Sequence, residues 1–113
     1  MYKIVILTLL LSFTAQAEVI KASGKVKEVW LFSKNYTTYN PNDVGLALIY
    51  MGTLTGACDT GYKRIAISTD HSLYQSVVST ALTAKTTGAT ITLWHLSTCN
   101  LRSSAWDFGL IKF

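Results

Sequence analysis

Side chains that could act as acid, base or nucleophile are scattered along this sequence. The carboxylates considered are Glu28, Asp43, Asp59, Asp70 and Asp107. An enzyme needs such groups to converge, and no G-x-S-x-G, H-E-x-x-H or P-loop pattern occurs here. Of the two histidines, His71 falls just before an expected helix and His95 on an expected strand. The sequence therefore predicts a protein that is not an enzyme and uses no cofactor.

The first 17 residues have the pattern of a secretory signal peptide. Lys3 precedes an apolar run over residues 4–11, and Ala15-Gln16-Ala17 matches a small-x-small cleavage site. The apolar run is shorter than the roughly 20 residues of a membrane-spanning helix, although a retained anchor is the alternative. We therefore expect residues 1–17 to be removed, no stable membrane insertion, and one secreted or periplasmic domain over residues 18–113.

Cys58 and Cys99 are the only cysteines in the chain. Because export implies an oxidising compartment, the economical expectation is a Cys58–Cys99 disulfide. Closing a loop of this length would stabilise the fold by roughly 3–4 kcal/mol. Two cysteines and two distant histidines do not have the spacing of zinc ligands, so no metal site is expected.

The charges that remain after residue 17 are mildly basic and dispersed. Nine Lys/Arg stand against six Asp/Glu, a net charge of +3, and the basic residues never form a run. Nucleic-acid binding normally shows a concentrated basic stripe. The sequence thus predicts no nucleic-acid partner, while attraction to anionic surface sugars or lipids is compatible with the charge.

Hydrophobic periodicity predicts five strands and one helix. The expected strands cover residues 24–32, 44–51, 62–68, 89–96 and 106–113. Between the third and fourth, residues 73–87 place their apolar side chains on one half of a helical wheel. Thr69 or Asp70 would cap the start of this helix, and Gly88 would end it in the left-handed conformation. On the fourth strand, Ile91, Leu93 and His95 should share one face.

The order β-β-β-α-β-β is that of the OB-fold, a five-stranded Greek-key barrel. We therefore predict a mainly β, OB-fold-like barrel with one helix that plugs one end of it. An α+β sandwich, with the helix lying on an open sheet, is the alternative. Residues 44–51 and the C-terminal strand could also be sheet edges that pair between subunits and close a ring.

One resemblance to a known family accompanies this pattern. Residues 81–88, ALTAKTTG, and the alternating strand after them resemble the B subunits of subtilase cytotoxin and pertussis-like toxins. Ser23-Gly24 before the first strand and Ala57-Cys58 before the third are similar too, whereas Ala22 and His95 replace aromatic residues of the family. The resemblance implies an exported pentamer that binds cell-surface glycans, with a toxin A chain as partner and Ser23 contacting the sugar. The sequence also resembles small exported bacterial proteins that carry one Cys pair.

Binding is the function that the residues favour. The candidate ligand-binding residues are Ser23, Tyr36 and His95, and the tryptophans are either packing residues or stacking surfaces. OB barrels bind oligosaccharides and oligonucleotides on one strand face and its loops. We expect an exported, non-catalytic module that binds a glycan as toxin B subunits do. The alternative is a periplasmic or secreted protein that binds a protein partner or a cell-envelope component, with no toxin role.

Overall fold

The computed structural model describes residues 18–34 and 45–113, and its elements follow the expected order. They are β1 (Val19–Phe32), β2 (Leu46–Met51), a 3-10 turn η1 (Ala57–Asp59), β3 (Arg64–Ser68), α1 (Tyr74–Thr87), β4 (Thr90–Leu96) and β5 (Trp106–Lys112). The expected signal peptide and the candidate residue Tyr36 lie outside the described residues. No helix in the described part is long and apolar enough to cross a membrane.

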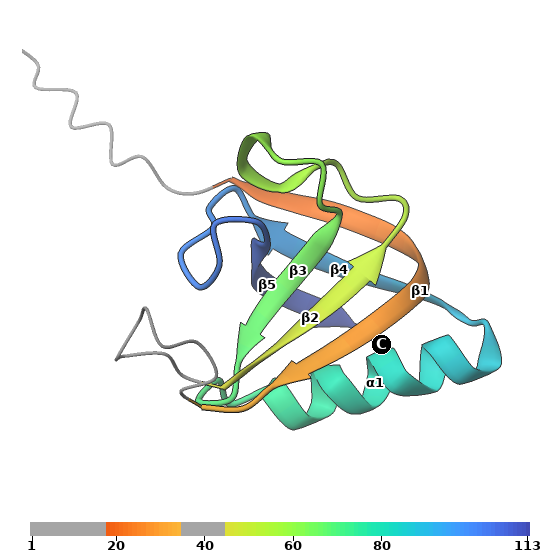
Figure 1. Cartoon of the computed structure of the whole chain (residues 1–113). Coiled ribbons are helices and arrows are strands. Elements are labelled where there is room, and N and C mark those ends of the chain that lie inside the picture. Colours follow the sequence, from red (N-terminus) through yellow and green to blue (C-terminus); the bar gives the residue numbers. More distant parts are fainter. Residues whose placement is uncertain (1–17, 35–44) are drawn as a thin grey trace, which may run out of the picture.

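The five strands close into a barrel, as Figure 1 shows. Their order around it is β1-β2-β3-β5-β4, and β4 pairs with β1 again. All neighbours are antiparallel except β3 and β5, whose parallel pairing is short, Ile65 with Trp106 and Ala66 with Asp107. The OB-fold-like barrel is therefore confirmed, and the open-sheet alternative is excluded.

Strand β1 starts five residues earlier than expected because it serves both halves of the barrel. Its residues 19–25 pair with β4, and its residues 26–32 pair with β2. A bulge between Val26 and Glu28 lies where the pairing changes. Bulges bend a strand and increase its twist, which lets one long strand wrap around a closed barrel.

Strand β2 corrects one expectation. It pairs with β1 on one side and with β3 on the other, so it is an interior strand. Its apolar run serves the barrel: Ala47, Ile49 and Met51 join the main core, while Leu46 and Leu48 pack in a second cluster with Ala66, Ala105 and Leu101. The expectation of a free edge for pairing between subunits is therefore wrong for residues 46–51, the part of that run that forms β2.

Helix α1 covers one end of the barrel, below the strands in Figure 1. Its inward side chains, Val77, Val78, Ala81 and Ala84, belong to the same core cluster as the barrel interior. Leu82, expected on the apolar face, is exposed. The expected plug is thus observed, with small side chains where the helix approaches the sheet.

The sequence predicts the end of α1 correctly but not the cap at its start. No side-chain cap is present at the start, so the expectation of Thr69 or Asp70 as a cap is wrong. Instead, the Leu73 N–H donates a hydrogen bond to His71 Nδ1 at 3.0 Å. At the other end, Gly88 adopts φ +73°, and its N–H donates to the Ala84 carbonyl, as expected.

Replacing Gly88 should isolate the cost of that left-handed conformation. A Cβ at Gly88 would meet nothing within 4 Å, and the same is true at Gly61, where φ is not left-handed. We expect Gly88→Ala to lower the free energy of unfolding by about 1–2 kcal/mol, and Gly61→Ala to leave it unchanged or slightly raised. Urea unfolding of both variants measures this, and equal values for the two would contradict the assignment.

The loops at the other end of the barrel are tied together covalently. The expected disulfide between Cys58 and Cys99 is present, with a Cα–Cα distance of 6.4 Å. It joins the β2–β3 connection (residues 52–63) to the β4–β5 connection (residues 97–105). Asp107, which is buried, accepts hydrogen bonds from the backbone N–H groups of Asn100 and Leu101 and from the Thr98 hydroxyl. Both loops are therefore fixed to the barrel and to each other.

Candidate ligand-binding faces

The structure separates the predicted site residues Ser23 and His95. Ser23 is exposed on β1, and its hydroxyl lies 2.8 Å from the Thr92 hydroxyl on β4. His95 is only 1% exposed and stacks on Trp106 with ring centroids 4.8 Å apart. It shares a face with Ile91 and Leu93, as the alternation predicts, and the structure shows that this face is the buried one. A surface ligand does not reach His95. Tyr36 lies outside the described residues, so Ser23 is the predicted ligand-binding residue that the structure shows at the surface.

Strand pairing surrounds Ser23 with polar side chains. Ser23 stands opposite Thr92, Thr92 stands opposite Lys112, and the neighbouring Lys21 stands opposite Trp94. A hollow of about 390 Å³ lies alongside, and its lining residues are Lys21, Thr80, Thr90, Ile91, Thr92, Lys112 and Phe113. We call this hollow, with the Ser23 hydroxyl at its side, the Ser23 groove.

The Ser23 groove combines hydroxyls, cations and rings. Its lining includes three threonines and two lysines but no carboxylate side chain. Lys21 Nζ lies 5.8 Å from the centre of the Trp94 ring, which keeps that ammonium group over the aromatic surface. Hydroxyls both donate and accept hydrogen bonds, whereas ammonium groups only donate. The groove therefore suits a ligand with many hydroxyls or with an acidic group.

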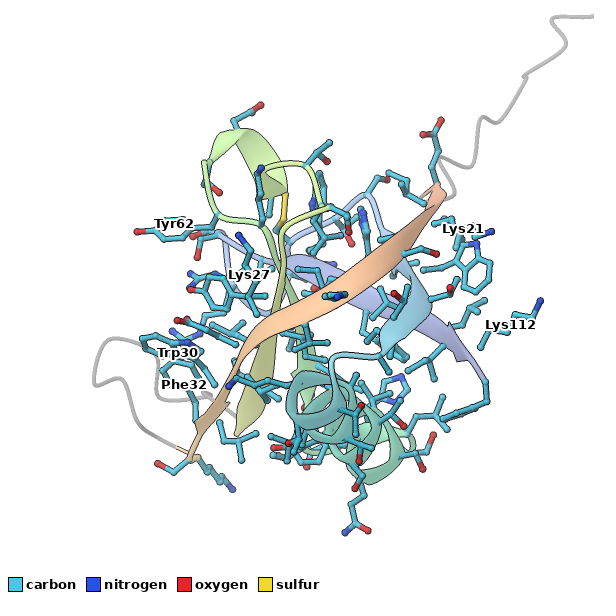
Figure 2. The ribbon with its side chains drawn as sticks, turned by 90° about the vertical axis from the view of Figure 1, so that its right-hand side faces the viewer. Lys21, Lys27, Trp30, Phe32, Tyr62 and Lys112 are labelled. Atoms are coloured by element: carbon cyan, nitrogen blue, oxygen red, sulfur yellow. A yellow bond between two sulfur atoms is a disulfide. The ribbon has the colours of Figure 1, made fainter. Side chains whose placement is uncertain are left out.

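A second surface lies on the outward side of β1, β2 and β3. Its exposed rings are Trp30, at 48%, and Tyr62, at 53%, and the partly buried rings of Phe32 and Tyr50 lie among them. The Trp30 ring centroid is 6.2 Å from that of Phe32 and 6.1 Å from that of Tyr50. In Figure 2, Lys27, Trp30, Phe32 and Tyr62 lie on one side of the view, away from Lys21 and Lys112 of the Ser23 groove.

Arg64 holds part of this second surface in place. Its Nε donates to the Ser104 carbonyl at 2.9 Å, another guanidinium nitrogen contacts the Ser104 hydroxyl, and Nη1 donates to the Tyr50 hydroxyl at 2.5 Å. The guanidinium carbon also lies 4.4 Å from the centre of the Tyr62 ring. Arg64 therefore connects two aromatic side chains of the surface to the β4–β5 connection.

Two lysines flank the same surface. A hollow of about 220 Å³ is lined by Lys27, Tyr50, Met51, Gly52, Gly61, Tyr62 and Lys63. Arg102 lies on the far side, with its guanidinium carbon 5.2 Å from the centre of the Phe32 ring. Glu28 is the acidic member, and its carboxylate accepts a hydrogen bond from Trp30 Nε1 at 2.8 Å. We call this surface the aromatic–basic face: Lys27, Glu28, Trp30, Phe32, Tyr50, Tyr62, Lys63, Arg64 and Arg102.

The sequence did not predict that these residues gather on one face. Its members come from three strands and two connections, and Lys27 is far in sequence from Lys63 and Arg64. The available signal was strand alternation, because every second residue of β1, such as Trp30 and Phe32, must face the same way. Placing that face beside Tyr50 required the strand register, which the sequence alone did not supply.

Comparison with known proteins identifies no similar protein. No family model matches the chain, and neither a curated protein nor a solved structure matches it. In the part of the chain that the structure describes, no three His, Cys, Asp or Glu side chains gather as metal ligands would. The geometry of the two faces is therefore the guide to what this protein binds.

Proposed function

We propose that this protein is an exported, non-catalytic module that binds a glycan in the Ser23 groove. The observation that carries the proposal is the exposed pair of hydroxyls, Ser23 and Thr92, 2.8 Å apart and bordered by Lys21 and Lys112. A sugar offers adjacent hydroxyls that such a pair can bind, and its apolar ring face can lie against an aromatic side chain. Trp94 and Phe113 are the rings available at the groove.

The wider toxin-like role is part of the same proposal. In that role the protein is secreted or periplasmic, assembles as a pentamer and accompanies a toxin A chain. Its support is the resemblance of residues 81–88 and of Ser23 to toxin B subunits, together with the closed OB-fold-like barrel. Light scattering tests the assembly, because a monomer at micromolar concentration would remove the ring from the proposal. Binding to an envelope component without any glycan would favour the alternative function.

Ser23→Ala tests the site itself. The substitution removes one hydroxyl at an exposed position, so the fold should keep its stability while the sugar loses a hydrogen bond worth about 1 kcal/mol, or roughly fivefold in affinity. Retention on a glycan array, followed by titration calorimetry with the retained sugar, measures this. Ser103→Ala, at an exposed serine of the β4–β5 connection, is the matched control. Equal affinities of the two variants would remove the Ser23 groove as the sugar site.

A further inference from the structure

The aromatic–basic face is a second surface that the proposed glycan site does not use. It is built on β1, β2 and β3, whereas the Ser23 groove lies over β1, β4, β5 and α1. Trp30 and Tyr62 are about half exposed, although aromatic side chains of this size usually bury most of their area. Exposed aromatic residues that cluster with cations indicate a binding surface.

Folding also gathers charge that the sequence disperses. Of the nine Lys/Arg after residue 17, four belong to this face: Lys27 and Lys63 are exposed, Arg64 is partly buried, and the Nε and Nη2 atoms of Arg102 are buried. The carboxylate of Glu28 is engaged by the indole N–H of Trp30. The sequence predicts no nucleic-acid partner because it has no basic run, but folding brings Lys27 and Lys63 to one hollow and places Arg64 against the Tyr62 ring.

The combination of rings and cations narrows the ligand class. Single-stranded nucleic acid offers flat base faces for stacking and a phosphate backbone for lysine and arginine. A neutral saccharide would use the rings but leave the lysines without a partner. A duplex hides its base faces by pairing and stacking, so it could use only the charges. We propose that the aromatic–basic face binds single-stranded nucleic acid, with bases stacked on Trp30 and Tyr62 and phosphates near Lys27 and Lys63.

This site should be sequence-tolerant and sensitive to salt. Stacking accepts any base, because every base has a π-face. Each phosphate contact with a lysine contributes about 0.7 to the slope of log K against log salt concentration for a single strand. Losing both Lys27 and Lys63 should therefore lower that slope by about 1.4. Losing the Trp30 ring should instead weaken binding at every salt concentration.

The test is fluorescence anisotropy with a labelled oligothymidylate of about 12 nucleotides, titrated with the purified protein at about 50 and 200 mM salt. We expect Trp30→Ala to weaken binding about tenfold and Trp30→Phe, which keeps a ring, to restore most of it. The double variant Lys27→Gln/Lys63→Gln should flatten the salt dependence. Trp94→Ala and Lys21→Gln, at the other face, are the matched controls and should bind as the wild type does.

Four results would overturn the proposal. They are no binding at the lower salt concentration, equal losses in the variants of the two faces, equal competition by a duplex of the same length, and displacement of the oligothymidylate by a neutral hexasaccharide. The last result would assign the face to saccharides. Ser23→Ala should leave oligothymidylate binding unchanged, so failure here and failure of the proposed glycan site are distinguishable.

Discussion

Replacing both cysteines, Cys58→Ser together with Cys99→Ser, should lower the free energy of unfolding by about 3–4 kcal/mol. The disulfide spans 41 residues in sequence, so its loss releases a large loop in the unfolded chain. It also joins the β2–β3 and β4–β5 connections, and non-glycine residues in this turn, Cys58 and Asp59, have positive φ values of 46° and 63°. Without the crosslink, that turn is free to relax.

Chemical denaturation with urea measures the loss, and thermal unfolding should shift by 10 °C or more at about 4–8 °C per kcal/mol. Ser103→Ala, on the same β4–β5 connection, controls for substitution in the loop and should change stability by less than about 0.5 kcal/mol. Wild-type protein in excess reductant should match the double variant. A double variant within 1 kcal/mol of the oxidised wild type would show that the disulfide is not a main support of this fold.

Asp107→Ala should cost about 2–4 kcal/mol, because one buried carboxylate serves three donors. Its oxygens lie 3.0 Å from the Asn100 N, 3.2 Å from the Leu101 N and 2.5 Å from the Thr98 hydroxyl. Removing the carboxylate leaves these groups without their acceptor at a partly buried site. The β4–β5 connection would then lose the anchor that it has besides the Cys58–Cys99 disulfide, and with it the position of Ser104 beside Arg64.

The same variant separates stability from function. Asp70→Ala, at an exposed carboxylate near the start of α1, is the control and should be close to neutral. Because Ser104 holds Arg64, Asp107→Ala should also weaken oligothymidylate binding while the protein is still folded. Urea unfolding and anisotropy on the same preparation test both statements. An Asp107→Ala variant as stable as Asp70→Ala would contradict the anchoring role.

Most of the architecture was predictable because strand and helix periods are local signals. Gly88 could be recognised as the end of α1, since a left-handed terminal residue favours glycine and the pattern changes there from helix to strand. The start of α1 could not be read in the same way. A backbone N–H bonds to a histidine ring nitrogen there, which is outside the usual capping residues.

The sites were less predictable because they depend on register between distant strands. The alternation of β4 correctly placed His95 with Ile91 and Leu93, but it did not reveal that this face is the interior. Ser23 and Thr92, whose hydroxyls lie side by side, are 69 residues apart in the sequence. Trp30 lies beside Tyr50 because of the register of β1 with β2, and the bulge between Val26 and Glu28 shifts that register.

Backbone amide chemical shifts, followed while a glycan retained on an array is titrated into the protein, test the central claim most directly. Binding in the Ser23 groove predicts that shifts concentrate at Lys21, Ser23, Thr92 and Lys112, while Trp30 and Tyr62 stay unchanged. Shifts centred on Trp30 and Tyr62 would contradict the assignment of the glycan to the Ser23 groove. An array that retains no glycan at all would contradict the proposed function.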